Sequence, residues 1–139
     1  MTFAAACAHA GGMILGMGAD LVEISRIRRS IDVYGDRFLN RIYTPVEQAY
    51  CAKKGNAAES FAARFAAKEA AMKAIATGMR GGVTWKDFEV SNETSGRPCL
   101  RLTGHALSHA ERMGVKRISI SLTHTAEHAF AVVLLEDGN

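Results

Sequence analysis

Residues 61–78 read FAARFAAKEAAMKAIATG, and this stretch decides the fold. It holds eight alanines, and because alanine is the strongest helix former it predicts a helix that Gly78 ends. Asn56 with Glu59 three residues later resembles a capping pair at its start. The bulky side chains share one stripe: Phe61, Phe65, Met72 and Ile75. Most of the alanines form a second apolar face, so we expect a long buried helix.

The predicted helix carries four charged residues, Arg64, Lys68, Glu69 and Lys73. Charges on a buried helix need partners or a ligand. Three cations beside one carboxylate suit a metal-bound phosphate group. Internal salt bridging is the alternative interpretation, and this helix alone favours neither.

Length and composition restrict the class of protein. A chain of 139 residues suffices for one domain with a real core, and its 48% hydrophobic and 22% charged residues are ordinary for a globular protein. A net charge of +3 without a basic run argues against a nucleic-acid partner. No apolar run of about twenty residues occurs, so we expect no membrane span.

The cysteines and the N-terminus bear on location. Cys7, Cys51 and Cys99 are odd in number and form no CxxC pair, which indicates free thiols in a reducing cytoplasm. Residues 1–12 lack a positive start and have only a short apolar run, so they make a poor signal peptide. We interpret 1–12 as a flexible extension and 13–139 as the domain.

The remaining patterns predict the element order. A short apolar strand spans 14–19 and ends at Asp20. Helical spacing and glycine or proline signals then predict helices over 23–34, 36–43 and 44–54 before the central one. After it come strands 87–91 and 98–103, a helix over 104–113, and strands 117–123 and 129–135. This order predicts an α+β fold with an antiparallel sheet, in a single compact domain.

Candidate chemistry is sparse and each candidate has an ordinary alternative. Asp20 and Glu69 are the carboxylates at plausible magnesium positions, although Asp20 could instead cap the next helix. His124 could be a hydrogen-bonded strand terminus, and Arg97 with Pro98 a solvated turn. The sequence has no GxSxG and no HExxH, which argues against a serine hydrolase or a zinc protease.

These residues, in this order, resemble the holo-acyl-carrier-protein synthases, the short single-domain 4′-phosphopantetheinyl transferases. GMGADLVEISRI is similar to the opening strand of the family, with its metal-binding aspartate, and FAARFAAKEAAMKAIATG to its signature helix. VTWKDFEV, SGRPCLRLTGHA and ISISLTHTAEHAFAVVLL follow in the family's order. The resemblance covers about residues 13–135.

The resemblance implies a reaction and an assembly. Members transfer the 4′-phosphopantetheine group from coenzyme A to a serine of acyl carrier protein, a step that depends on magnesium and supports fatty acid biosynthesis. They release adenosine 3′,5′-bisphosphate. The short members assemble as homotrimers with active sites at subunit interfaces. We therefore expect an enzyme whose partners are coenzyme A and acyl carrier protein.

The resemblance also implies roles for individual residues. Asp20 and Glu69 correspond to the magnesium ligands, and Lys73 to the group that stabilises or protonates the leaving phosphate. The implied coenzyme A contacts are Arg64, Lys68, Lys73, Arg97, Pro98, His124 and Thr125. Thr123 stands where the family has a serine. The implied carrier-docking residues are Arg26, Arg28 and Arg29. The general base stays open, with Glu69 through a bound water as one candidate.

Two other classes of function compete with the enzyme. A non-catalytic coenzyme-A-binding module would keep the fold without activity, but the retention of Asp20, Glu69 and Lys73 together argues against it. Alternatively, the helix with Arg26–Arg29 docks an acidic partner and the rest is scaffold. Magnesium-dependent addition of the pantetheine arm to acyl carrier protein separates both from the enzyme.

Overall fold

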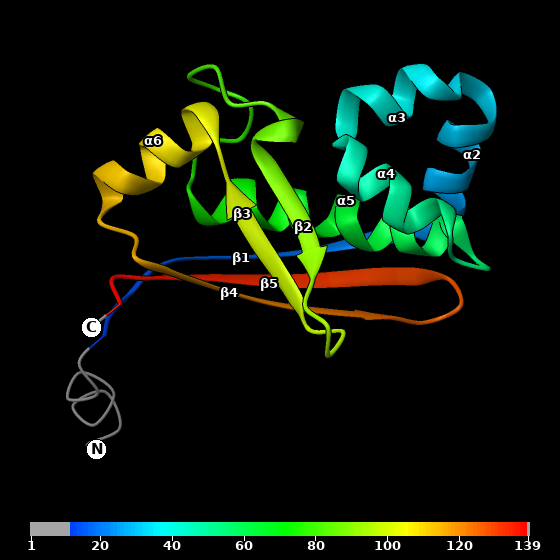
Figure 1. Ribbon diagram of the computed structural model, residues 1–139. Helices are drawn as coiled ribbons and strands as arrows, with labels where there is room; N and C mark the ends of the chain where they lie inside the picture. Colours follow the sequence, from blue (N-terminus) through cyan, green and yellow to red (C-terminus); the bar gives the residue numbers. More distant parts are fainter. Residues whose placement is uncertain (1–11, 139) are drawn as a thin grey trace.

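The computed structural model describes residues 12–138, so the extension expected over residues 1–12 falls, except for Gly12, outside the described part. Eleven elements follow one another within these described residues (Figure 1). They are β1 (Ile14–Glu23), α2 (Ile24–Tyr34), α3 (Asp36–Ile42), α4 (Pro45–Ala52), α5 (Ala57–Ala74), η1 (Trp85–Asp87), β2 (Phe88–Asn92), β3 (Pro98–Leu102), α6 (Gly104–Met113), β4 (Arg117–His124) and β5 (His128–Glu136). The expected α+β fold is confirmed.

Two antiparallel sheets flank the central helix. One has three strands in the order β1-β5-β4, and the other is the β2-β3 hairpin. The helices lie on one side of the three-stranded sheet, with α5 running across it and α2–α4 at one end (Figure 1). The almost wholly apolar β5 lies in the middle, where a strand is covered on both edges.

Helix α5 is buried because small residues let it approach the sheet. Its alanines from Ala62 to Ala74 have almost no exposed surface, and β1 presents Gly16 and Gly18 to it. A Cβ on Gly18 would collide with the carbonyl oxygen of Ala70, and one on Gly16 with that of Ala74. Gly16 and Gly18 therefore allow α5 to pack closely against β1.

Two predicted boundaries were wrong. β1 does not end at Asp20 but continues to Glu23, because Asp20 pairs with Ala131 and the ladder runs on to His128. α5 starts at Ala57, and the expected cap is confirmed there, because the Asn56 side chain accepts a hydrogen bond from the backbone N–H of Glu59; the wrong boundary is the end, which lies at Ala74. The helix stops before Gly78 because Ala76 adopts a left-handed conformation with φ of 61°.

On the outer face of the three-stranded sheet, β1 and β5 present apolar side chains, and no described helix covers them (Figure 1). Met17 and Leu21 of β1 are 64% and 63% exposed there. Register places them opposite Leu134 and Phe130 of β5, which are half-buried. An apolar sheet face of this kind is typical of a protein interface.

Candidate active site

The first group of predicted site residues lies where β1 crosses α5. Lys73 donates a hydrogen bond to Asp20 Oδ1 at 2.9 Å and another to the carbonyl oxygen of Ala19 at 3.0 Å. The Lys73 side chain is 55% exposed, so its ammonium group remains open to solvent or a ligand. Asp20 cannot be the helix cap considered above, because Glu23 occupies the N-cap of α2 and no side chain caps it. We call Asp20, Glu69 and Lys73 the carboxylate site.

Glu69 belongs to this site by its electrostatics. Burial raises the pKa of its carboxyl group, and the nearby carboxylate of Asp20 raises that pKa further. Lys73 and Arg26 oppose these two effects. Asp20 and Glu69 are thus two carboxylates that repel each other in a half-buried site. Such a pair fits Mg²⁺, which needs only one or two protein carboxylates. No group of three metal-ligating side chains occurs among residues 12–138.

A cleft of about 420 Å³ adjoins the carboxylate site. Glu69 and Lys73 line it together with the apolar side chains of Met72, Met79 and Trp85. Trp85 stacks on Phe65 with a ring-centroid distance of 5.0 Å, which fixes one wall. The carboxylate site therefore opens onto an apolar cleft rather than onto a flat surface.

A second cleft of about 480 Å³ lies on the other side of α5, and we call it the arginine cleft. Arg64 is almost fully buried at its edge, donates to Asn92 Oδ1 at 2.6 Å and stacks on Tyr50 with its Cζ 4.1 Å from the ring centroid. Its Nε is buried without a hydrogen-bond partner among the described residues. A buried guanidinium with an unused donor beside a cleft is suited to an anionic ligand.

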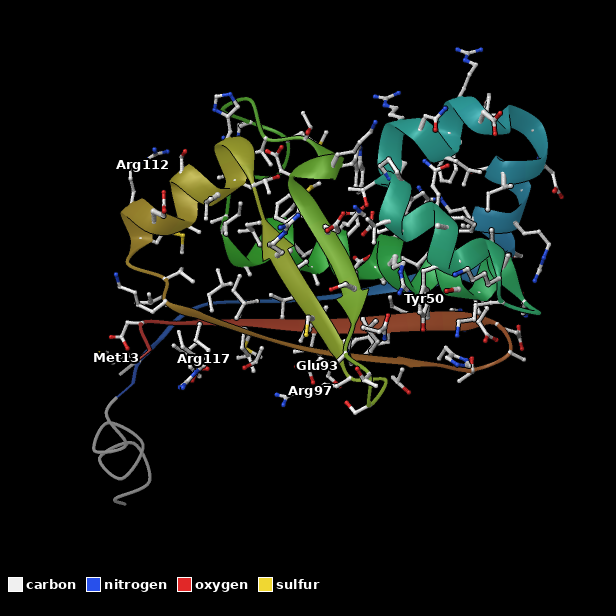
Figure 2. All side chains as sticks on the ribbon, in the orientation of Figure 1. Met13, Tyr50, Glu93, Arg97, Arg112 and Arg117 are labelled. Carbon is white, nitrogen blue, oxygen red and sulfur yellow. The ribbon has the colours of Figure 1, made fainter. Side chains whose placement is uncertain are left out.

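The arginine cleft also gathers predicted residues from distant segments. Gly96 and Pro98 come from the β2–β3 hairpin, and Thr123 and His124 from the end of β4. Arg97 is exposed at the hairpin tip beside them (Figure 2). Thr125 does not line the cleft; its hydroxyl accepts the backbone N–H groups of Glu127 and His128 in the β4–β5 turn.

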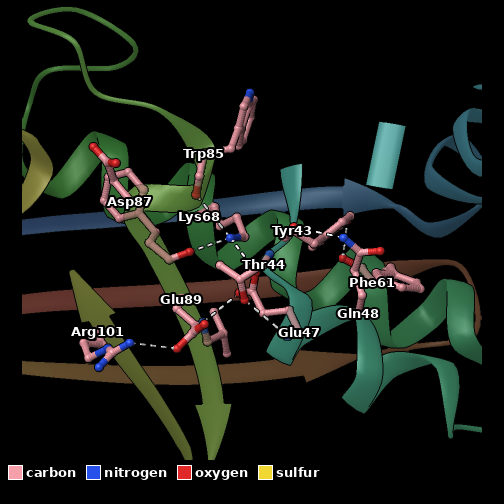
Figure 3. A network of polar contacts seen from close by, with 12 residues as sticks. Tyr43, Thr44, Glu47, Gln48, Phe61, Lys68, Trp85, Asp87, Glu89 and Arg101 are labelled. Carbon is pink, nitrogen blue, oxygen red and sulfur yellow. Dashed lines mark hydrogen bonds and ion pairs between the residues drawn. The ribbon is translucent and has the colours of Figure 1, made fainter. Parts of the chain in front are cut away.

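Lys68 is a further predicted ligand residue that lines neither cleft. Its side chain is fully buried, forms a 2.7 Å ion pair with Glu47 and donates to the carbonyl oxygens of Trp85 and Phe88 (Figure 3). Burial lowers the pKa of this ammonium group, and Glu47 opposes that shift. Every donor of Lys68 faces the interior, so the internal salt bridge considered for this helix describes Lys68 in this structure, and the coenzyme A contact implied for it stays a prediction.

The two clefts face opposite sides of one helix. Nine residues separate Arg64 from Lys73, which is two and a half helical turns. The two clefts have no lining residue in common. The predicted residues at the two clefts thus form two groups on each chain, and a ligand that contacts both groups from one chain would have to pass around α5.

Sequence reasoning did not identify Tyr50 and Glu59 as residues of the arginine cleft. Tyr50 contacts both Arg64 and Lys54, with the Lys54 Nζ 4.5 Å from the ring centroid. Glu59 looked like a capping partner, yet its carboxylate lies 3.4 Å from Nδ1 of His124. Nothing local signalled that contact, because 65 positions separate the two residues.

Comparison with known proteins identifies the class. The 4′-phosphopantetheinyl transferase superfamily profile matches residues 16–133, and the chain belongs to this superfamily. The holo-[acyl-carrier-protein] synthase of Koribacter versatilis is 60% identical over 125 residues, which cover 90% of this chain and all of the relative. The predicted resemblance and the expectation of an enzyme of this class are confirmed.

Solved structures agree with the sequence comparison. The holo-[acyl-carrier-protein] synthase of Neisseria meningitidis has a TM-score of 0.80 at 36% identity, over 88% of this chain and 98% of that one. The Helicobacter pylori synthase, solved in complex with coenzyme A, has a TM-score of 0.76 at 29% identity, over 86% of this chain and 98% of that one.

Within residues 12–138 we find no helix long and apolar enough to cross a bilayer.

Proposed function

We propose that this enzyme transfers the 4′-phosphopantetheine group from coenzyme A to a serine of acyl carrier protein. The serine oxygen forms a bond to the phosphorus that carries the pantetheine arm, and the bond from that phosphorus to the bridging oxygen breaks. The hydroxyl proton leaves, and adenosine 3′,5′-bisphosphate departs with the bridging oxygen. The carrier protein that has received the arm then serves fatty acid biosynthesis.

The observation that carries the proposal is the carboxylate site, where Lys73 bridges to Asp20 beside the half-buried Glu69. Asp20 and Glu69 would hold Mg²⁺, which when bound neutralises charge on a pyrophosphate and on the group transferred. Lys73 lies close enough to both carboxylates to place its ammonium on a phosphate oxygen that approaches them. Glu69 remains a candidate for accepting the serine proton.

We assign the arginine cleft to the nucleotide end of coenzyme A. Arg64 offers a buried guanidinium with an unused donor, and Arg97, Pro98 and His124 lie on or beside the same cleft. The coenzyme A complex of the Helicobacter pylori relative supports the choice of ligand.

We propose a cytoplasmic location for the enzyme. Cys51 and Cys99 are free thiols, which fits this location.

We propose a homotrimer in which the two groups of site residues meet across subunit interfaces. The family resemblance suggests the number of subunits. The uncovered apolar face of β1 and β5, with Met17 and Leu21 exposed, supports an interface. The position of the two clefts on opposite sides of α5 supports a shared site, because neighbouring chains could bring them together.

The decisive experiment is the mass of acyl carrier protein after incubation with coenzyme A and this enzyme. We expect addition of the phosphopantetheine arm with Mg²⁺ and none after chelation. A mass gain that survives complete chelation would contradict the role of the metal. Coenzyme A binding without any mass gain would favour the non-catalytic module, and carrier binding without either would favour a docking protein.

The assembly is tested by light scattering of the full chain. We expect about three times the 15.0 kDa mass of one chain. Substitution of Leu21 by Glu should disperse the trimer, because it places a charge in the apolar interface. A wild-type monomer with full activity would contradict the shared site.

A further inference from the structure

We propose that Glu59 is a positioning residue, which orients His124 so that the Nε2 edge of the ring faces a ligand in the arginine cleft. Both residues line that cleft, and Glu59 Oε2 lies 3.4 Å from Nδ1 of His124. The two ring nitrogens lie on different edges of an imidazole, so a contact at Nδ1 leaves Nε2 for the ligand. This inference rests on the proposed function, because coenzyme A is the ligand.

Glu59 itself is well fixed, so it can orient a more mobile side chain. It lies in the first turn of α5, and its backbone N–H is held by the capping side chain of Asn56 at 3.2 Å. A carboxylate near a helix N-terminus is also favoured by the helix dipole. Its side chain is 28% exposed, whereas that of His124 is 51% exposed. Without the carboxylate the ring would be free to turn about its χ angles.

The position of a carboxylate in an anion-binding cleft calls for an explanation. The other charged residues that line this cleft are Lys54 and Arg64, and the exposed Arg97 lies at the hairpin tip. All three attract a nucleotide phosphate, whereas Glu59 repels it. If Glu59 acted only through its charge, its removal would strengthen coenzyme A binding. If it acts by holding His124, its removal weakens binding. The two explanations therefore differ in sign.

The test measures coenzyme A affinity by calorimetry on the assembled enzyme, without acyl carrier protein. We expect Glu59→Ala to weaken affinity about tenfold, the effect of losing one well-oriented hydrogen bond to a charged group. Glu59→Gln keeps an acceptor for Nδ1 and should stay within about threefold of wild type. Glu93→Ala is the matched control, because Glu93 is an exposed carboxylate near the hairpin tip that does not line the cleft.

A double-variant cycle shows whether Glu59 acts through His124. We expect Glu59→Ala to add no further loss to His124→Ala, because the residue that it orients is then gone. In turnover assays, Glu59→Ala should raise the KM for coenzyme A and leave kcat and the carrier KM nearly unchanged.

Three results would overturn the inference. They are equal or tighter coenzyme A binding by Glu59→Ala, losses that add fully in the double variant, and a Gln variant as weak as the Ala variant. A wild-type enzyme that binds no coenzyme A would instead overturn the proposed function, and this inference with it.

Discussion

Two lysines of α5, five positions apart, each pair with a carboxylate, and their surroundings give them different roles. Lys68 and Glu47 are both fully buried, and every donor and acceptor of the pair has a protein partner. Lys73 and Asp20 lie at similar distance, but Lys73 is 55% exposed. The sequence pattern makes the two lysines look equivalent. The difference is that the Lys68 pair joins α4 and β2 to α5. The exposed ammonium group of Lys73, by contrast, can exchange Asp20 for a ligand.

The largest effect is expected from substitution of Lys68, which tests whether its buried ion pair with Glu47 stabilises the fold. Lys68→Met leaves the Glu47 carboxylate buried without a cation, so we expect the free energy of unfolding to fall by about 3–5 kcal/mol. Denaturant unfolding measures this. The double variant Lys68→Met with Glu47→Gln should regain part of the loss, because the uncompensated charge is gone.

The outcome that contradicts this role is a folded Lys68→Met enzyme of wild-type stability with a much raised KM for coenzyme A. Such a result would mean that Lys68 leaves its ion pair to contact the ligand, as the family resemblance implied.

The carboxylates of the exposed pair should affect activity rather than stability. Asp20→Asn and Glu69→Gln replace anionic oxygens by neutral ones, so each should lower magnesium-dependent transfer about a thousandfold or more. Unfolding free energies should stay close to wild type. Mass spectrometry of the carrier at ordinary Mg²⁺ is the measurement, and near-normal turnover in either variant would refute the metal assignment.

Lys73→Met is the direct counterpart of Lys68→Met. An exposed ion pair contributes only about 0–1 kcal/mol to stability, so the fold should survive. We expect kcat to fall about a hundredfold, which is typical of losing one group that stabilises developing charge. If Lys73→Met destabilised the enzyme as much as Lys68→Met, the contrast between the two lysines would be false.

Features set by residues close together in the sequence were predicted well, and features set by residues far apart were not. Alanine content and the apolar stripe predicted α5 because helix formation is local, and alternation predicted β4. The strand end at Asp20 was wrong because an acidic residue looks like a terminus, while the ladder with β5 that extends it is set by a partner more than a hundred residues away. The same holds for the site. Lys68 looked like a phosphate ligand because its partner, Glu47, lies on another helix.

The smallest effect is expected at the surface of α2 next to the carboxylate site, where we propose that acyl carrier protein docks. Arg26, Arg28 and Arg29 are exposed on α2, while Ile24 and Ile27 face the core. Arg28 donates to Asn56 at 3.5 Å, whereas Arg26 lies near enough to Glu69 to lower the pKa of its carboxyl group. Arg26 is therefore the best placed of the three to meet an acidic carrier whose serine approaches the carboxylate site.

We predict that Arg26→Glu raises the KM for acyl carrier protein several-fold and leaves that for coenzyme A unchanged, since an exposed charge contributes about 0–1 kcal/mol. Charge complementarity acts mainly on encounter and orientation, so the defect should be largest at low salt, and wild-type carrier affinity should fall as ionic strength rises. Arg112→Glu, an exposed arginine on α6 at the far end of the molecule, makes the same charge change away from the site (Figure 2). Equal effects of the two variants would mean that net charge, and not the α2 surface, governs docking.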